Sequence, residues 1–172
     1  MRALVVFESM FGNTQVIAEA IADGLSGRMQ VDLLEVGAAP AEVGDDVALL
    51  LVGGPTHAFG MSRPGTRQDA AKQASGGLVS TGTGLREWLA RLQRRTGVAA
   101  AAFDTRVNRP RLPGSAARAA EKRLRQLGFQ VVAPAASFYV EGTLGPLLEG
   151  ERERARRWGE QALADTDVEP AR

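Results

Sequence analysis

The first 26 residues pass from an apolar run through a short polar loop into a helical pattern. Ala3–Phe7 is apolar throughout and predicts a strand, and the apolar spacing from Thr14 to about Ser26 predicts a helix. The first N–H groups of a helix have no intrahelical partner, and the helix dipole favours negative charge there. A strand that turns directly into a helix therefore predicts an anion-binding loop between the two.

The composition of this loop narrows the choice of anion. Ser9 and Thr14 supply hydroxyls, and Asn13 supplies an amide. Gly12 lets a ligand approach the backbone closely. The loop contains no Lys or Arg, and Glu8 opens it. A nucleoside triphosphate would require a lysine and a metal ligand here, so the loop predicts a single phosphate.

Apolar runs and helical patterns continue to alternate after this first unit. Six apolar residues at Val47–Val52 predict a central strand, and the alternation within Val31–Val36 predicts an edge strand. Further strands are predicted at 98–103 and 129–140, and further helices at 66–73, 85–93, 116–127 and 146–164. Pro134 predicts a break or an edge position in the last strand. Five strands alternating with helices predict an α/β fold, a doubly wound parallel sheet with helices on both faces.

The segment that follows the third strand is long. Thr66–Asp69 has the pattern of a capping box and predicts a short helix that runs to Gln73. Residues 75–84 are rich in Gly, Ser and Thr and are predicted to be mobile. We therefore expect one short helix and one mobile stretch in this segment.

Composition excludes several classes of function. A chain of 172 residues fits one domain, which we assign to residues 1–165, with a frayed tail at 166–172. The net charge of +1 favours neither nucleic-acid binding nor a strong steering field. The absence of cysteine excludes disulfides, iron–sulfur clusters and thiol catalysis, and no His, Asp or Glu cluster has metal-binding spacing. No apolar stretch suits membrane insertion or a secretory signal, so we expect a cytoplasmic protein.

Three loops leave the carboxyl ends of predicted strands, at 8–14, 53–63 and 104–115. In open parallel sheets, ligands bind beyond these ends, at the point where the strand order reverses. The second loop carries large planar or soft side chains at His57, Phe59 and Met61. A phosphate loop beside such a segment predicts a ligand with a flat heteroaromatic ring and one phosphate.

Val5–Ile21 carries a more specific pattern. It resembles the flavodoxin signature, whose defined positions are filled here by Val5, Val6, Phe7, Ser9, Gly12, Thr14, Ala18 and Ile21. The strand count, the short second connection and the position of the Gly-Pro-Thr loop extend the resemblance over nearly the whole chain. It implies a flavodoxin-like three-layer fold with five parallel strands in the order 2-1-3-4-5, and FMN as a non-covalent cofactor.

The resemblance also implies which residues hold the cofactor. The FMN phosphate would be held by Ser9, Met10, Phe11, Gly12, Asn13 and Thr14. The isoalloxazine ring would be flanked by Pro55, Thr56, His57, Phe59 and Gly60 on one side and by Asp104, Thr105 and Arg106 on the other. In flavodoxins a backbone carbonyl of the second loop turns toward the flavin, and Gly60 is the position expected to permit this.

The residue types around the expected ring leave three functions open. Electron-carrier flavodoxins are usually acidic and hold the ring between Trp and Tyr, whereas this chain is near neutral and its second loop has one aromatic residue, Phe59. Its third loop carries Arg106, Arg109 and Arg111. We expect an electron carrier that works with a redox partner protein or a small-molecule acceptor. The alternatives are an FMN-dependent NAD(P)H:quinone-type oxidoreductase, whose Pro-Thr…Phe-Gly-Met string is similar, and a flavodoxin-fold interaction module that has lost flavin.

Three further side chains have competing interpretations. His57, the single histidine, is either a proton donor at the ring or a packing residue. Trp88 and Trp158 lie at helical core spacing, so they are predicted to pack in the core rather than to stack on a flavin.

Overall fold

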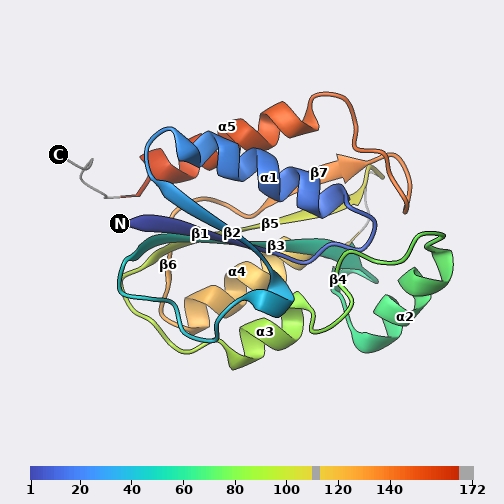
Figure 1. Cartoon of the computed structure of the whole chain (residues 1–172), viewed down its shortest axis with the longest axis horizontal. Helices are drawn as coiled ribbons and strands as arrows, with labels where there is room; N and C mark the ends of the chain where they lie inside the picture. The colour runs from blue at the N-terminus through green and yellow to red at the C-terminus, as the bar shows by residue number, and fades with distance from the viewer. Residues whose placement is uncertain (110–112, 167–172) are drawn as a thin grey trace.

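A central, mostly parallel sheet lies between two layers of helices in the computed structural model (Figure 1). The structure describes residues 1–109 and 113–166. Its strands are β1 (Arg2–Phe7), β2 (Gln30–Glu35), β3 (Val47–His57), β4 (Gly60–Met61), β5 (Ala99–Val107), β6 (Gln130–Val131) and β7 (Ala136–Val140). Its helices are α1 (Asn13–Ser26), α2 (Pro64–Gln73), α3 (Leu85–Arg91), α4 (Ala116–Gln126) and α5 (Glu151–Ala164), with a 3-10 turn, η1, at Val36–Ala38.

The strands lie in the order β2-β1-β3-β5-β6, and β7 also pairs with β5. These pairings are parallel, whereas β4 turns back antiparallel to β3. The predicted order 2-1-3-4-5 is confirmed, with the fifth predicted strand divided into β6 and β7. The gap between them contains Pro134, as predicted, because proline has no N–H to donate to a ladder. The edge position of β2 and the central position of β3 are also confirmed.

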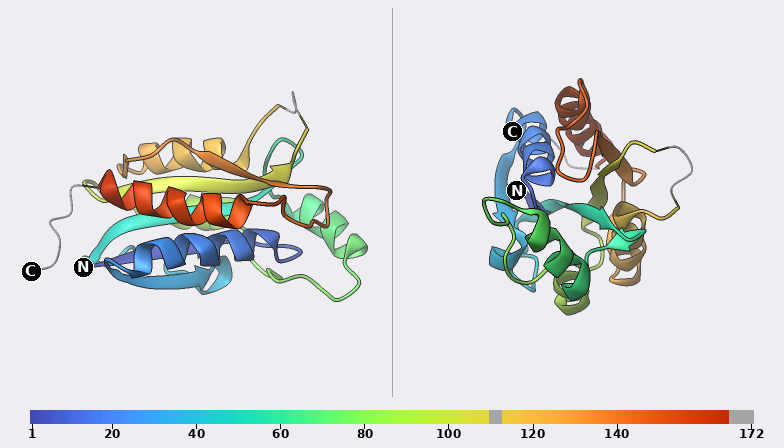
Figure 2. Two further views of the ribbon diagram at one scale, coloured as in Figure 1. Left: turned by 90° about the horizontal axis from the view of Figure 1, so that it is seen from above. Right: turned by 90° about the vertical axis from the view of Figure 1, so that its right-hand side faces the viewer.

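The helices α1 and α5 cover one face of the sheet, and α3 and α4 cover the other (Figure 1 and Figure 2). Successive β1 residues alternate between these faces: Val5 packs with α1 and α5, and Val6 packs with α3 and α4. Trp88 is buried, and Trp158 lies edge-to-face on Phe103 with the ring centroids 5.9 Å apart. Both tryptophans therefore pack in the core, as predicted.

Glycines allow α1 and α5 to pack closely. A Cβ on Gly159 would lie 2.8 Å from the carbonyl oxygen of Ile21, and a Cβ on Gly24 would overlap the carbonyl oxygen of Arg156. Backbone in contact with backbone leaves no room for an added side chain. This face of the sheet is closed, so a ligand site must be sought at an end of the sheet.

The strands β3 and β5 both run further than the sequence predicted. The predicted strands ended at Val52 and Phe103, whereas β3 continues to His57 and β5 to Val107. The two strands stay paired beyond Gly53, so the ladder continues past the apolar runs that predicted it. Several residues expected in the second and third loops therefore belong to strands.

Two helices begin at residues other than those predicted. The helix α2 begins at Pro64 rather than after a cap at Thr66, because the fixed φ of proline suits the first helical position. The last helix was predicted from Pro146, whereas α5 starts after Gly150, which has a φ of 85°. Leu147 forms an antiparallel bridge with β7, so the chain is still extended where the helix was expected.

Thr166, predicted to begin a frayed tail, packs onto the end of α5. It is buried, and its hydroxyl donates to the carbonyl oxygen of Ala162 at 2.8 Å. The rest of the predicted tail, residues 167–172, lies outside the described residues, as does Arg111 of the third loop. Within residues 1–109 and 113–166, no helix has the length and apolar character needed to cross a membrane.

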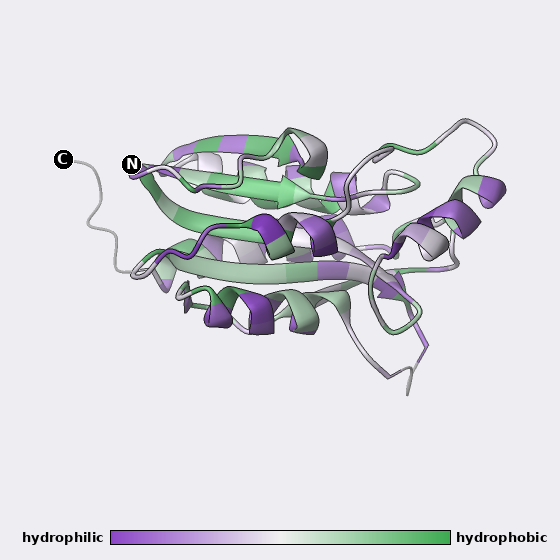
Figure 3. Ribbon diagram, turned by 90° about the horizontal axis from the view of Figure 1, so that it is seen from below, coloured by the Kyte–Doolittle hydropathy of each residue, from purple (hydrophilic) through white to green (hydrophobic). Residues whose placement is uncertain are grey.

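The helix α2 stands beyond the carboxyl ends of the strands (Figure 1). Figure 3 shows that its surface is mostly hydrophilic, and Ala70 is its buried residue. A helix with so little apolar surface gains little from core packing. Its position therefore depends on the polar contacts described below.

Candidate functional site

A cavity of about 110 Å³ opens at the carboxyl ends of β1, β3 and β5. The predicted site residues that line it are Ser9, Met10, Phe11, Asn13, Thr14, Pro55, Thr56, His57, Thr105 and Arg106. Parts of all three predicted segments therefore meet, at the point where the strand order reverses.

The other predicted site residues lie around the cavity. Gly12 is the N-cap residue of α1 and has a φ of 96°, which glycine adopts without strain. Asp104 is fully buried. Phe59 is 60% exposed at the tip of the β3–β4 hairpin, and Gly60 follows it in β4.

Three lining residues were not predicted from the sequence: Val107, Val140 and Thr143. Val107 belongs to the unpredicted extension of β5. The last strand was predicted to end at Val140, and its carboxyl end lies at the same edge of the sheet as the others. That shared edge was the available signal for Val140 and Thr143.

The loop between β1 and α1 presents hydrogen-bond donors without a basic side chain. In the described part of the chain, no side chain caps α1, so its first N–H groups remain available to a ligand. Ser9 Oγ accepts a hydrogen bond from Gly12 N–H at 3.1 Å and keeps its own proton to donate. Thr14 Oγ1 and Thr105 Oγ1 lie 2.7 Å apart, and this bond uses one of their two protons. No Asp or Glu is among the described lining residues, so the donor set fits a phosphate.

Residues 79–80 hold the outer side of this loop. Val79 N–H donates to the carbonyl oxygen of Met10 at 3.0 Å, and Ser80 N–H donates to that of Ser9 at 2.7 Å. Ser80 Oγ also accepts from Ser9 N–H at 2.9 Å. The stretch predicted to be mobile is therefore hydrogen-bonded to the loop. Ser9 and Ser80 are 71 positions apart in sequence, so local composition could not predict this contact.

Glu8 lies beside this loop but does not line the cavity. Its carboxylate accepts hydrogen bonds from Leu85 N–H at 2.6 Å and from the Ser62 hydroxyl. Burial raises the pKa of Glu8, and it outweighs these hydrogen bonds and the positive charge of Arg67, which lower that pKa. Arg67 donates to Ser62 and pairs with Glu87. This cluster fastens α2 and the start of α3 to the end of β1.

Asp104 supports the other side of the cavity from within the protein. Its Oδ2 accepts from Thr56 Oγ1 at 3.1 Å and from Ala117 N–H at 3.0 Å. It also accepts from Ser115, whose hydroxyl caps α4 by accepting from Arg118 N–H. The carboxylate thus joins the end of β3 to the N-terminus of α4, where the helix dipole favours a negative charge. Asp104 positions the site and does not line it.

His57 connects the cavity to α2. Its Nδ1 lies 3.0 Å from Thr66 Oγ1, which donates to the carbonyl oxygen of Arg63 at 3.0 Å. Because Thr66 has one hydroxyl proton, this arrangement makes Nδ1 of His57 the donor and Nε2 an acceptor. Burial lowers the pKa of His57, and the positive charge of Arg67 lowers it further. The imidazole is therefore neutral near pH 7.

A strained turn displays Phe59. His57 pairs with Gly60, which leaves Ala58 and Phe59 as a two-residue turn with φ values of 45° and 73°. This left-handed conformation costs a residue with a Cβ roughly 1–2 kcal/mol, and such turns usually carry Asn-Gly. The left-handed positions of the turn are those of Ala58 and Phe59, and Gly60, where a backbone carbonyl is expected to turn toward the flavin, follows them in β4.

A doubly wound sheet with a donor-rich loop at its carboxyl edge is the architecture of nucleotide-binding α/β proteins. The sequence model of the flavodoxin family matches residues 5–158, and the chain belongs to that family. No protein in the curated set matches the chain in sequence. The chain is accordingly an FMN-binding, electron-transfer protein of the flavodoxin type.

Solved flavodoxin structures share this fold. Flavodoxin 1 from Bacillus cereus is 18% identical and has a TM-score of 0.70, over 98% of this chain and 100% of that chain. The flavodoxin of Streptococcus pneumonia TIGR4 is 18% identical with a TM-score of 0.69, over 96% of this chain and 100% of its own. Rubredoxin oxygen:oxidoreductase from Desulfovibrio gigas is 16% identical with a TM-score of 0.61, over 95% of this chain and 36% of its own. The same fold thus occurs alone and within a larger protein.

Proposed function

We propose that the chain is an electron carrier that binds the FMN phosphate on residues 9–14 and the ring against residues 55–57 and 105–106. The donor set of the cavity carries this proposal: hydroxyls, helix N–H groups and Arg106, with no carboxylate among the described lining residues. Bound FMN supplies one- and two-electron redox chemistry, and the protein supplies binding, orientation and electrostatics.

On the phosphate side, neutral donors do the binding. A phosphate beside the N-terminus of α1 gains from the helix dipole and from the uncapped N–H groups. Ser9 and the Thr14–Thr105 pair add hydroxyl protons, and hydrogen bonds to a charged acceptor are stronger than neutral ones. These donors suit the single phosphate of FMN without a metal ion.

On the ring side, the site is open. The cavity of about 110 Å³ is smaller than the roughly 300–1,000 Å³ of most ligand pockets, so a ligand of FMN size extends toward the edge of the sheet. Arg106 Nη1 donates to the carbonyl oxygen of Gly114 at 2.8 Å, which holds the guanidinium beside the cavity. Its positive charge favours electron uptake by the ligand. We propose that the open edge meets a redox partner protein or a small-molecule acceptor in the cytoplasm.

Paired titrations with FMN and riboflavin test this proposal. Riboflavin carries the same ring without the phosphate, so FMN is expected to bind at least about ten-fold more tightly, as one charge-assisted hydrogen bond requires. The purified protein is expected to show the visible spectrum of a flavin. Equal affinity for the two ligands would contradict the placement of the phosphate. Failure to bind micromolar FMN would leave the interaction module as the function.

His57 favours a second candidate, an FMN-dependent NAD(P)H:quinone-type oxidoreductase. A neutral imidazole that lines the cavity is placed to exchange a proton with a ligand. If the chain is an electron carrier, we expect a mixture of protein, FMN, NADPH and a quinone to reduce the quinone no faster than free FMN does with the same reagents. A faster rate that falls in the His57→Gln variant would show that the chain is the oxidoreductase and not a carrier.

A further inference from the structure

An arginine side chain braces the hairpin that displays Phe59, and a second arginine follows the hairpin. Arg86 donates from Nη2 to the carbonyl oxygen of Met61 at 2.8 Å, and from Nε to that of Ser62 at 3.2 Å. Arg63 is exposed and follows directly after this part of the chain. Two guanidinium groups therefore belong to the hairpin and its exit.

The opposite side of the hairpin is also lined by arginine. Gly114 packs so closely on the backbone of Phe59 that a Cβ at Gly114 would overlap it, and Arg106 donates to the Gly114 carbonyl oxygen. Arg118 is exposed in the first turn of α4, and α4 packs against β4. We call the surface formed by Phe59, Arg63, Arg86, Arg106 and Arg118 the arginine face.

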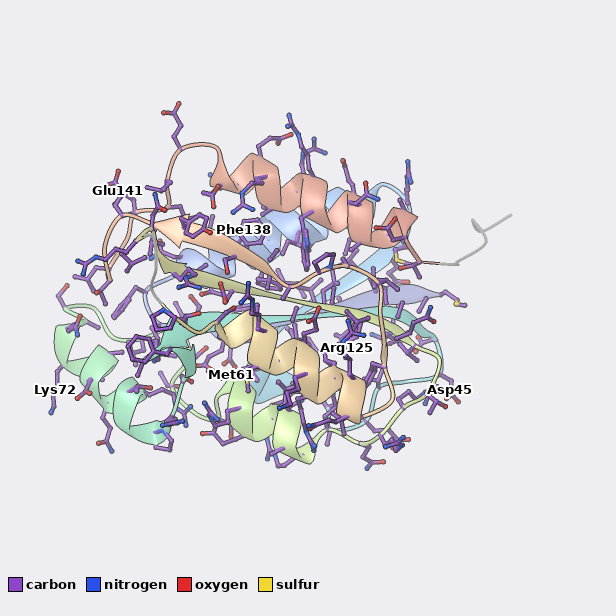
Figure 4. The ribbon with its side chains drawn as sticks, turned by 180° about the vertical axis from the view of Figure 1, so that it is seen from behind. Asp45, Met61, Lys72, Arg125, Phe138 and Glu141 are labelled. Atoms are coloured by element: carbon purple, nitrogen blue, oxygen red, sulfur yellow. The ribbon has the colours of Figure 1, made fainter. Side chains whose placement is uncertain are left out.

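Three of the four segments that form this face carry no carboxylate, and the fourth, which holds Arg86, carries Glu87. The described residues 55–66, 105–109 and 113–120 contain no Asp or Glu. The nearby Glu8 and Asp104 are buried, and Glu87 is paired with an arginine of α2. Figure 4 places Glu141 on the opposite side of this edge from Met61 of β4. The arginine face is therefore positive, although the whole chain has a net charge of +1.

Phe59 gives the arginine face an apolar centre. Its side chain is 60% exposed and does not line the cavity. A strained turn that holds a large apolar side chain in water gains nothing for folding, and such strain clusters at functional sites. Aromatic and arginine residues dominate the binding energy of protein interfaces. A projecting apolar side chain suits the surface of a protein partner. A second nucleotide would instead require a second cavity to enclose it.

We propose that the arginine face docks an acidic protein segment that covers Phe59 with an apolar residue of its own. The proposal rests on the proposed electron-carrier function, because His57 links the hairpin to the ring side of the cavity. Opposite charge speeds the encounter and selects the partner, and the apolar contact holds the complex. The charge of the partner is then opposite to the one that an acidic flavodoxin carrier would select.

A labelled peptide probe tests the proposal on the FMN-loaded full chain. A short peptide of Glu, Asp and two Leu residues is compared with a peptide in which Lys replaces every acidic residue. We expect only the acidic peptide to bind, about ten-fold more weakly in 200 mM than in 50 mM NaCl because salt screens exposed charge. In ¹H–¹⁵N spectra it should shift the amide signals of residues 57–63 and 114–118.

Two matched charge reversals locate the interaction. Arg63→Glu/Arg118→Glu should weaken acidic-peptide binding at least ten-fold, whereas Arg28→Glu/Arg91→Glu, at exposed arginines outside the face, should leave it unchanged. Phe59→Ser should weaken the binding that remains at high salt. FMN affinity should be unchanged in the two double variants, because none of their four residues lines the cavity.

The other outcomes separate failure of the docking proposal from failure of the proposed function. Equal binding of the basic peptide, or equal loss in the two double variants, would overturn the arginine face as a selective surface. Shifts of the same amides by NADPH without the peptide would make the face a nucleotide site, and equal competition by single-stranded DNA would make it a general polyanion site. Loss of FMN binding with peptide binding intact would overturn the proposed function alone.

Discussion

The two sides of the cavity differ in how their backbones are held. On the phosphate side, Ser9 is buried and hydrogen-bonded to Ser80 through its own N–H and carbonyl groups, and Glu8 is buried next to it. On the ring side, Phe59 is exposed, and it shares a left-handed turn with Ala58. The first side is preorganised to bind one anion, whereas the second stores strain in a projecting turn. One edge of the sheet thus combines a rigidly held phosphate loop with an exposed, strained turn.

Charge divides the edge in the same way. The phosphate side offers hydroxyls and N–H groups, and residues 8–14 contain no basic side chain. The ring side carries the four arginines of the arginine face. A dipole-based anion site acts over a short range, whereas guanidinium groups at the surface act over roughly a Debye length of 8–10 Å. The same edge can therefore retain one ligand and attract a larger one.

The largest effect is expected at Gly53, where the two sides meet. Its carbonyl oxygen accepts from Glu8 N–H at 2.9 Å, and a Cβ on it would overlap the ring of Phe103. Gly53→Ala should lower the free energy of unfolding by about 2–3 kcal/mol through overpacking, and should impair both sides together. Gly65→Ala is the control, because nothing lies within 4 Å of its added Cβ, and it should raise stability by up to about 1 kcal/mol. Urea unfolding measures both, and equal changes would contradict the overlap.

The next effect separates the two sides through ligand choice. Ser9→Ala removes a hydroxyl donor from the phosphate side and should weaken FMN binding by about 1.5–3 kcal/mol, roughly 10- to 150-fold. Riboflavin affinity should not change, because riboflavin has no phosphate. Phe59→Ala, on the ring side, should change the affinities for FMN and riboflavin by the same factor. That factor should be smaller than the effect of Ser9→Ala on FMN binding. Fluorescence titration measures these affinities. If Ser9→Ala weakened the binding of FMN and riboflavin equally, the two sides would not bind separate parts of the ligand.

A smaller effect measures the strain on the ring side. Ala58→Asn/Phe59→Gly places the residues preferred by this turn at its two left-handed positions and should raise the free energy of unfolding by about 1 kcal/mol. The same variant should lose affinity for the acidic peptide, because it removes the apolar centre of the arginine face. Phe59→Ala keeps the Cβ and the strain, so it should lose affinity without gaining stability. No gain in the double variant would show that the turn stores no strain.

The smallest effects are expected in the pH dependence of stability, where the two sides should have slopes of opposite sign. Burial raises the pKa of Glu8 above 4.5, so its contribution is present below that pH and is lost as pH rises through the raised pKa. Burial lowers the pKa of His57 below 6.5, so its contribution is present above that pH and is lost as pH falls through the lowered pKa. The free energy of unfolding, measured across pH, should lose the slope due to Glu8 in Glu8→Gln and the slope due to His57 in His57→Gln. Slopes of the same sign would contradict the assigned burial.

The phosphate side was predictable because its residues are consecutive. A strand, a glycine and a helix start within residues 2–14 place Ser9 and Thr14 beside uncapped N–H groups, and each step depends on neighbours in sequence. The ring side was predicted less well. Pro55 and His57 were expected in a loop but lie in β3, because the ladder with β5 continues past the apolar run. Strand length there depends on pairing with residues about 50 positions away, which composition does not encode.

Contacts distant in sequence account for the remaining differences. The stretch around Ser80 has the composition of a mobile loop, yet it is hydrogen-bonded to Ser9. Glu8 was read as the first residue of a polar loop, but Leu85 and Ser62 enclose its carboxylate. The tip of the hairpin was expected in a loop of ordinary backbone, whereas Ala58 and Phe59 both have left-handed φ values, which only the paired strands on either side impose.

The amino-acid sequence by itself determined the α/β class, the strand order, the anion loop and the expectation of FMN. The α/β class and the anion loop follow from the periodicity and order of consecutive residues, whereas the strand order and FMN are implied by the resemblance of residues 5–21 to the flavodoxin signature. Only the tertiary structure decided which polar groups are buried, where β3 and β5 end, and that Arg86 and Arg106 bind backbone next to the hairpin of an exposed Phe59. These properties arise from segments that lie far apart in sequence and meet at one edge of the sheet.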